Sequence, residues 1–323
     1  MNLLLTGGAG FIGSHILEAA INDTRIEKIR VLDNLSAGFL HNIEPFIESP
    51  KVEFKEGDIR NRETCALVMK GVTAVCHQAA MGSVPRSIQT PELTHDNNVT
   101  GFINIATAAR EEGVKRIVYA SSSSVYGDAN YQPKVEYKIG NPLSPYAVSK
   151  HANELYGEVF AKNYGMTIAG FRYFNVFGPR QDPNGPYAAV IPLFFKHALH
   201  GTSPTINGDG SITRDYTYVG NVVKANINAL FGSTWQGHEV FNIACGETTT
   251  LNTLWMVIKE ITQSSSKAVY GPNRKGDILH SLADISKAAK LIDYADLTNL
   301  EVGLTQALTW YRKQLTPTQR ASS

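Results

Sequence analysis

The 323-residue sequence has no excess of either charge, because 30 Lys and Arg residues stand against 29 Asp and Glu residues. This near balance argues against a protein that coats duplex nucleic acid, whose affinity comes largely from many phosphate contacts. Charged residues make up 18% and hydrophobic residues 43% of the chain, which excludes wholesale disorder. We therefore expect no nucleic-acid partner and about two globular domains.

Cysteine is also scarce. Cys65, Cys76 and Cys245 are odd in number and form no Cys-x-x-Cys pair. We therefore expect neither a disulfide framework nor a zinc ribbon. The nine histidines show no His-Glu-x-x-His or other ligand spacing, so the sequence predicts no metal site.

Long apolar runs are missing as well. Residues 3–5 are too short for the apolar core of a signal peptide, and no basic residue precedes them. No stretch approaches the roughly 20 apolar residues that a membrane helix needs. We expect a soluble, cytoplasmic protein with no membrane partner.

The first half of the chain alternates short apolar runs with segments of helical spacing. This alternation predicts strands at residues 3–6, 29–32, 52–55, 74–77, 117–120 and 167–171, and helices at 12–21, 63–70, 98–112 and 146–164. Short apolar runs separated by helices are typical of a parallel sheet covered on both faces. The predicted fold class is therefore α/β, with a doubly wound parallel sheet.

A glycine-rich segment joins the first predicted strand to the first predicted helix. Gly7, Gly10 and Gly13 permit a tight turn in which backbone N–H groups approach a pyrophosphate at a helix N-terminus. Asp33 follows Gly13 by 20 residues, at the end of the second predicted strand. A carboxylate there binds the hydroxyl groups of the adenosine ribose and repels a 2′-phosphate. The pattern predicts a Rossmann-type domain that binds NAD rather than NADP.

Tyr146 and Lys150 lie four residues apart in a predicted helix and therefore share one face. A nearby cation, either Lys150 or an oxidised nicotinamide, would lower the pKa of the phenol from about 10 toward the range that base catalysis needs. Serines at 121–124 follow a predicted strand, at the sheet edge where parallel sheets bind ligands. We predict Tyr146, Lys150 and Ser122 as catalytic residues.

The Gly-x-x-Gly-x-x-Gly spacing and this catalytic set resemble the extended short-chain dehydrogenase/reductases of the NAD-dependent epimerase/dehydratase family, which act on nucleotide sugars. The resemblance covers nearly the whole chain, including residues 77–80, 98–101 and 172–178. It implies NAD as the cofactor. The implied cofactor-binding residues are Gly7, Gly10, Phe11, Ile12, Gly13, Asp33, Asn34, Asp58, Ile59, Gln78, Ala79, Ala80, Asn98, Tyr146, Lys150 and Tyr173.

The residues after the catalytic hydroxyl distinguish reactions within this family. The 4,6-dehydratases carry Thr-Asp-Glu there, and the UDP-glucuronate decarboxylases place a Glu in the same segment. Residues 122–124 of this chain are all serine and offer no carboxylate. The resemblance therefore implies epimerisation at C4, which needs only removal and return of a hydride.

Within the family the chain most resembles bacterial UDP-N-acetylglucosamine 4-epimerases, through residues 82–87, 141–145 and 181–185. Ser281 stands where epimerases restricted to plain sugars carry a Tyr, and a small side chain leaves room for a 2-acetamido group. The resemblance implies that Arg214 and Arg274 bind the diphosphate of UDP and that Asp277 contacts the uridine ribose. The implied substrate-binding residues are Gly82, Ser83, Arg86, Ser122, Ser123, Ser124, Tyr146, Asn175, Ala189, Val190, Asn207, Arg214, Arg274, Asp277 and Ser281.

The sequence pattern changes beyond residue 174, where frequent prolines predict loops and short helices. We expect an NAD-binding Rossmann domain at 1–173, which also takes in about 216–243 through a strand near 240–243. A smaller α/β UDP-sugar-binding domain is expected at 174–323, mainly 174–215 and 244–315. By resemblance we expect a homodimer through the helices near 98–112 and 146–163.

Three other functions stay open. A UDP-glucose/UDP-galactose 4-epimerase uses the same chemistry with a different preference at C2. A net reductase or dehydrogenase would change the redox state of added nicotinamide cofactor. A non-catalytic NAD-binding sensor would need neither Tyr146 nor Lys150, and this chain has both.

Overall fold

A computed structural model describes residues 1–185, 188–272 and 280–315 of the chain. Seven strands form a central sheet in the order β11-β6-β5-β4-β1-β2-β3, and every neighbouring pair is parallel. The strands are β1 (Asn2–Thr6), β2 (Lys28–Asp33), β3 (Val52–Glu56), β4 (Ala74–His77), β5 (Arg116–Ser122), β6 (Thr167–Tyr173) and β11 (His238–Ile243). The predicted strand near 240–243 therefore joins the sheet at its edge, beside β6.

The central strands are buried on both faces. Leu3 and Leu5 of β1 pack into one apolar layer, whereas Leu4 packs into the other, because successive side chains of a strand point to opposite faces. All four residues of β4 are buried in the same way. A continuous apolar run in the sequence thus becomes a strand covered on both sides.

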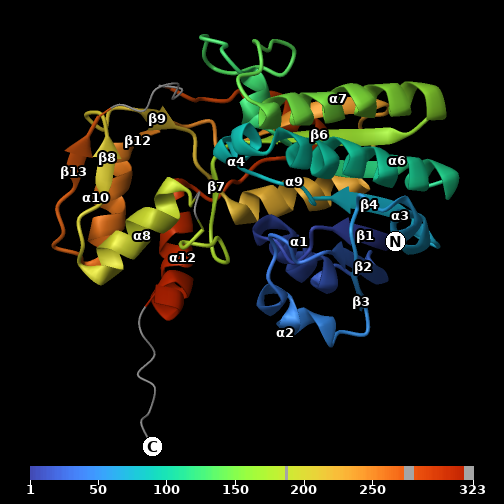
Figure 1. Cartoon of the computed structure of the whole chain (residues 1–323), viewed down its shortest axis with the longest axis horizontal. Helices are drawn as coiled ribbons and strands as arrows, with labels where there is room; N and C mark the ends of the chain where they lie inside the picture. The colour runs from blue at the N-terminus through green and yellow to red at the C-terminus, as the bar shows by residue number, and fades with distance from the viewer. Residues whose placement is uncertain (186–187, 273–279, 316–323) are drawn as a thin grey trace, which may run out of the picture.

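Helices cover both faces of the sheet (Figure 1). On one face lie α1 (Phe11–Asn22) and α9 (Val219–Phe231), whose buried residues belong to the same apolar layer as Leu3. On the other face lie α3 (Arg62–Met69), α6 (Gly101–Glu111) and α7 (Pro145–Tyr164). The prediction of a doubly wound α/β sheet is confirmed.

A smaller region with its own core lies beside the sheet, on the left of Figure 1. It contains α8 (Val190–His200), α10 (Leu251–Thr262) and α12 (Leu300–Leu315), together with the strand pair β8 (Thr205–Asn207) and β13 (Val269–Gly271). The remaining elements are short: a 3-10 turn at Leu40–Asn42, α2 (Glu44–Ile47), α4 (Val84–Gln89), α5 (Pro91–His95), a π turn at Asp96–Thr100, a 3-10 turn at Ser123–Tyr126, β7 (Val176–Phe177), β9 (Thr213–Arg214), β10 (Thr217–Tyr218), β12 (Thr249–Thr250) and α11 (Ser286–Ile292). The predicted smaller α/β region at the C-terminal side is confirmed.

The short helices α2 and α4 are absent from the prediction. Each has a proline at its second position, and the two helices are four and six residues long. Fewer than two helical turns cannot display a periodic apolar pattern, so local sequence carries little signal for them. The predicted helix at 98–112 also differs, because it starts as a π turn before α6 begins.

Within the described ranges, no helix combines the length and the apolar character needed to span a membrane. The same residues bring together no group of three His, Cys, Asp or Glu side chains that could hold a metal ion. All three thiols are free, with Cys65 and Cys76 buried.

Candidate active site

A cavity of about 400 Å³ lies at the carboxyl ends of the central strands, where open parallel sheets bind ligands. Most of the predicted cofactor residues line it. They are Gly7, Gly10, Phe11, Ile12, Gly13, Asp33, Asn34, Ile59, Gln78, Ala79, Ala80, Tyr146, Lys150 and Tyr173. Residues from five strand ends and two helices therefore meet in one place.

The turn between β1 and α1 is closed tightly by glycine. Gly7 has a φ of +70°, and a Cβ atom there would lie 2.5 Å from the backbone N of Ala79. A Cβ at Gly13 would lie 2.1 Å from the carbonyl O of Gly7. Gly10 lines the cavity and precedes α1, whose N-terminus has no side-chain cap among the described residues. The N–H groups of the first turn of α1 thus suit the diphosphate of a dinucleotide.

Asp33 ends β2 and is held in place by the backbone. Its Oδ2 accepts a hydrogen bond from Ala9 N at 2.9 Å, and its Oδ1 accepts one from Leu35 N at 2.8 Å. Burial raises the pKa of Asp33, and these two hydrogen bonds oppose the rise. Each carboxylate oxygen has a second acceptor site, so the group fits the two hydroxyls of an adenosine ribose.

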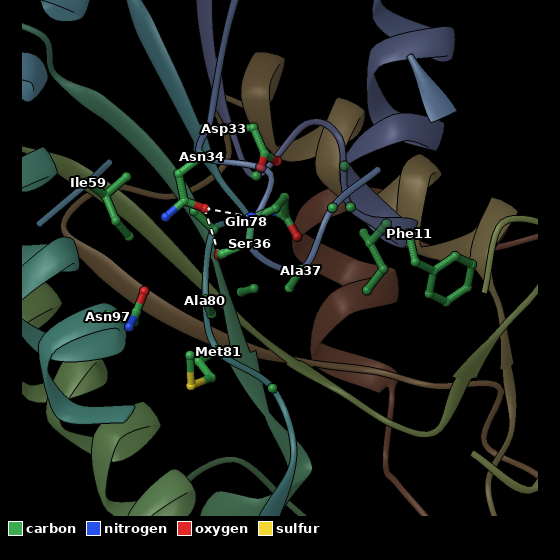
Figure 2. Close-up of a pocket in the computed structure, with 18 of the residues that line it drawn as sticks. Phe11, Asp33, Asn34, Ser36, Ala37, Ile59, Gln78, Ala80, Met81 and Asn97 are labelled. Carbon is green, nitrogen blue, oxygen red and sulfur yellow. Dashed lines mark hydrogen bonds between the residues drawn. The ribbon is translucent and has the colours of Figure 1, made fainter. Parts of the chain in front are cut away.

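Asn34 extends this wall of the cavity. Its Oδ1 accepts hydrogen bonds from the backbone N and the Oγ of Ser36, drawn as dashed lines in Figure 2. Its Nδ2 donates to Asp58 Oδ2 at 3.0 Å. Arg60 binds the same carboxylate and holds the pKa of Asp58 at about 2. Asp58 itself lies behind the lining, whereas its neighbour Ile59 faces the cavity.

Several lining residues were not predicted from the sequence. Figure 2 shows Ser36, Ala37, Met81 and Asn97 at the cavity. A signal for the first two exists, because the segment after Asp33 contains Asn34, Ser36 and Gly38, which are residue types that favour turns. A turn-forming segment directly after the strand that carries the acid could therefore have been assigned to the same wall.

The predicted catalytic residues come from two elements. Ser122 ends β5, while Tyr146 and Lys150 lie in the first two turns of α7. Ser144 caps this helix by accepting a hydrogen bond from Ala147 N at 3.1 Å, which fixes where Tyr146 enters the cavity. The Ser122 side chain acts on the phenol of Tyr146 by lowering its pKa. All three residues line the same cavity.

The sequence suggests that the Lys150 ammonium could lower the pKa of the Tyr146 phenol, but in the structure this ammonium binds a backbone carbonyl oxygen. Lys150 Nζ donates to Ala120 O at 2.7 Å and lies 6.0 Å from the centroid of the Tyr146 ring. Burial raises the pKa of Tyr146, and only the Ser122 hydrogen bond opposes it. Burial also lowers the pKa of Lys150 to about 8. Of the two cations considered from the sequence, Lys150 therefore does not bring the Tyr146 pKa below 10 in this arrangement.

Asn98 lies behind the cavity rather than in its lining. Its Oδ1 accepts from Met81 N at 2.7 Å, and its Nδ2 donates to Met81 O at 3.2 Å and Ser149 Oγ at 3.0 Å. Asn98 thus fixes the backbone of the loop whose Met81 side chain faces the cavity. The neighbouring Asn97 takes the place in the lining.

A second cavity, of about 560 Å³, lies in the smaller region and shares Val176 with the first. Apolar residues form much of its wall, including Phe177, Ile191 and Phe194. The predicted substrate residues in its lining are Asn175, Ala189, Val190, Asn207 and Arg214. An apolar slot beside an arginine suits a flat base followed by a diphosphate.

The other predicted substrate residues lie elsewhere. Gly82 and Ser122 line the first cavity. Ser83, Arg86, Ser123, Ser124 and Ser281, all of them described, are in the lining of neither cavity. Ser124 donates from its N and Oγ to Ser122 Oγ, and Ser83 accepts from Arg86 N at 3.3 Å as the cap of α4. Arg274 and Asp277 lie outside the described residues.

A model of the NAD dependent epimerase/dehydratase family matches residues 3–244, which include the glycine turn, Asp33 and the predicted catalytic residues. The chain belongs to the NAD dependent epimerase/dehydratase family. NAD is the cofactor, and structures of similar proteins in the family contain it.

Three relatives cover almost the whole of this family member. A putative UDP-glucose 4-epimerase of Methanocaldococcus jannaschii is 40% identical over 96% of this chain and 98% of its own length. The UDP-glucose 4-epimerase of Thermotoga maritima, solved with UDP-glucose, is 37% identical over 98% of this chain and 100% of that chain, with a TM-score of 0.90. A UDP-N-acetylglucosamine 4-epimerase of Methanobrevibacter ruminantium, solved with UDP-N-acetylmuramic acid, is 37% identical over 97% and 98% of the two chains, with a TM-score of 0.89.

These similarities support an NAD-dependent nucleotide-sugar 4-epimerase. They do not single out the acetylated branch that the sequence resembles, because solved structures of both kinds are 37% identical to this chain. The relative with 40% identity is named for the plain sugar.

Proposed function

We propose that this chain interconverts UDP-glucose and UDP-galactose by inverting C4 through a transient 4-keto sugar. The observation that carries the proposal is the meeting of Ser122, Tyr146 and Lys150 in the wall of the cavity built by the glycine turn and Asp33. That cavity shares Val176 with the slot that contains Arg214, which supports a UDP-sugar bound in the slot with its hexose directed toward the first cavity.

The proton transfer is assigned to Tyr146. When bound, oxidised NAD accepts and returns a hydride, and its positively charged ring favours the Tyr146 phenolate. Tyr146 then takes the proton from the sugar 4-hydroxyl while Ser122 hydrogen-bonds the same oxygen. Lys150, fixed by Ala120 O, keeps a positive charge at pH 7 on the same wall. Once the keto sugar has turned over, so that the other face of its C4 receives the returning hydride, Tyr146 gives the proton back to the 4-oxygen.

The UDP half is proposed to anchor the substrate. The slot between α8 and β8 would take the base, and Arg214 at its end would bind the diphosphate, with Arg274 and Asp277 assigned by family resemblance. Holding only the UDP half leaves the hexose free to rotate, which inversion requires. We assign NAD binding to residues 1–173 with about 216–243, and UDP-sugar binding mainly to 174–215 and 244–315.

A second candidate is the acetylated pair, UDP-N-acetylglucosamine and UDP-N-acetylgalactosamine. It is favoured by the Methanobrevibacter ruminantium relative. By family resemblance it is also favoured by the small Ser281 side chain, although Ser281 is in the lining of neither cavity. A pocket with room beside C2 of the hexose accepts both plain and acetylated sugars. We therefore propose a plain-sugar epimerase that also turns over acetylated substrates.

The test is incubation of the purified protein, without added cofactor, with UDP-glucose and separately with UDP-N-acetylglucosamine. Interconversion at C4, followed by NMR, with no net change in the 340 nm absorbance of NADH supports the proposal. Accumulation of NADH or of a keto product instead identifies a net dehydrogenase. The ratio of kcat/KM for the two substrates ranks the plain and acetylated candidates.

A further inference from the structure

Three side chains form a closed ring of hydrogen bonds in the wall of the NAD cavity and directly behind it. Asn226 Nδ2 donates to Tyr173 Oη at 2.9 Å, Tyr173 Oη donates to Gln78 Oε1 at 3.0 Å, and Gln78 Nε2 donates to Asn226 Oδ1 at 3.1 Å. Every donor therefore meets an acceptor, and each bond polarises the next.

The ring joins parts of the fold that the sheet keeps apart. Gln78 directly follows β4 and Tyr173 ends β6, and these two strands are separated by β5. Asn226 reaches both from α9, which covers this face of the sheet. Gln78 and Tyr173 line the NAD cavity, whereas Asn226 is completely buried outside the lining.

The chemistry of Asn226 matches this position closely. Its second Nδ2 hydrogen is donated to Val222 O at 2.8 Å, one helical turn back. Its Oδ1 also lies 3.5 Å from Cys76 Sγ, a thiol donor. A carboxamide supplies two donors and an acceptor in one plane, whereas a carboxylate lacks the donors and an alkyl group lacks both. Asn226 therefore fixes the direction of the Tyr173 hydroxyl and which end of the Gln78 amide faces Tyr173.

We propose that Asn226 is a positioning residue for NAD, acting through Gln78 and Tyr173. By holding both side chains in one orientation, it presets the cavity wall, so the cofactor meets a surface that needs no reordering. Without Asn226, the two side chains lose a buried partner and turn to satisfy each other or the cavity. The proposal depends on NAD as cofactor and is independent of which UDP-hexose is the substrate.

The experiment compares Asn226→Ala and Asn226→Asp with Asn228→Ala in the full-length protein. Asn228 lies on the same helix, but its amide binds Ile292 O and Asp293 O and not the ring. NAD affinity is measured by titration of cofactor-stripped protein, and NAD content by chromatography of the denatured, freshly purified protein. Removal of one buried hydrogen-bonding partner predicts NAD binding weakened by about tenfold or more in both Asn226 variants. Asn228→Ala should bind NAD within about twofold of wild type.

A purely structural role is excluded by two further readings. Saturating NAD should restore kcat of Asn226→Ala, while its KM for the UDP-sugar stays within about threefold of wild type. If Asn226 acts through the ring, Tyr173→Phe combined with Asn226→Asp should weaken NAD binding by less than the product of the single effects. NAD affinity of Asn226→Asp within twofold of wild type, or strictly multiplicative effects in the double variant, would overturn the proposal. Because NAD binding is read directly, the two binding outcomes that would overturn the proposal stand even if the protein epimerises neither sugar.

Discussion

Two features of the cavity wall shift the pKa of the Tyr146 phenol in opposite directions. Burial raises its pKa, which disfavours the phenolate, and the Ser122 hydrogen bond works the other way. The Lys150 ammonium is bound to Ala120 O instead of the phenol. In the proposed mechanism, base catalysis by Tyr146 would therefore depend on the charge of the bound cofactor, and proton transfer would require NAD to be oxidised and in place.

Replacement of Tyr146 by Phe should abolish most turnover. The substitution keeps the ring and removes only the hydroxyl, so kcat should fall by about 10²- to 10⁴-fold while the Kd of the UDP-sugar changes little. The measurement is epimerisation followed by NMR together with calorimetric titration of substrate. Tyr156→Phe, at a 40% exposed position of the same helix, is the control and should keep the wild-type rate. A Tyr146→Phe enzyme with near wild-type kcat would remove Tyr146 from the mechanism.

Enlargement of the Ser281 side chain should separate the two kinds of substrate. If the small residue admits the 2-acetamido group, Ser281→Tyr should lower kcat/KM for UDP-N-acetylglucosamine at least about tenfold and leave UDP-glucose nearly unchanged. Ser281→Ala keeps the volume small and serves as control, with both substrates retained. Equal losses on both substrates in Ser281→Tyr would show that Ser281 does not contact the C2 substituent.

At the scale of elements, α1 is fastened to the loop after β7. Arg180 Nη2 donates to His15 Nδ1 at 2.9 Å, and His15 Nε2 donates to Pro179 O at 2.9 Å. Arg180 also donates to Ser14 O at 3.1 Å and forms an ion pair with Glu18. Because Nδ1 must accept from a guanidinium, His15 is neutral with its proton on Nε2. The helix that begins at the glycine turn is thus tied to the segment that borders the second cavity.

This contact predicts a loss of stability in acid. Burial, together with the Arg180 charge, lowers the pKa of His15 to about 4 from 6.5. Between these values the unfolded chain binds a proton that the folded chain does not, so stability falls as the pH drops from 6.5 toward 4. His15 alone should contribute a loss of about 3 kcal/mol by pH 4.

The measurement is urea unfolding of wild type and His15→Gln at pH 8 and pH 4. Gln keeps a donor and an acceptor but does not titrate, so the variant should lose about 3 kcal/mol less than wild type between the two conditions. His41→Gln, at an exposed position, should follow wild type. An identical pH dependence in wild type and His15→Gln would show that the contact persists with His15 protonated.

At the scale of the whole molecule, one surface remains apolar. Val148, Leu155 and Val159 lie on one side of α7 and are 54%, 54% and 50% exposed. Ile88 of α4 and Leu93 of α5 are exposed nearby, and α5 packs against α7. The helix α6, described in full, carries no exposed large apolar side chain. These exposed side chains favour α7, one of the two helices expected at the dimer interface, together with α4 and α5.

Charge on this surface should prevent dimer formation. We expect the wild type to sediment as a dimer and Leu155→Glu as a monomer, because burying an unpaired carboxylate in an apolar interface is costly. Sedimentation velocity over a range of concentrations measures the change. Met256→Glu, at an exposed apolar position of α10 far from α7, should stay dimeric. A monomeric wild type, or a dimeric Leu155→Glu, would contradict the assignment of this surface.

Local patterns in the sequence were sufficient to predict the sheet, the glycine turn and the helix that carries Tyr146 and Lys150. The turn at Gly7 needs a positive φ that glycine adopts freely, and Tyr146 and Lys150 share a face because they are four residues apart. Asp33 could be placed because it ends a strand next to that turn. Each of these rests on spacing or on backbone geometry within a short segment, which the sequence by itself determines.

The tertiary structure alone decided which distant side chains meet. Asn226 lies 148 residues from Gln78, and His15 lies 164 residues from Pro179, yet each pair is hydrogen-bonded. No periodicity or turn signal relates residues so far apart in the sequence. Their contact depends on how the helices and loops pack against the sheet in the folded chain. The same holds for the pKa of Tyr146, whose direction follows from burial, a property of the packed sheet and helices and not of the Tyr-x-x-x-Lys spacing.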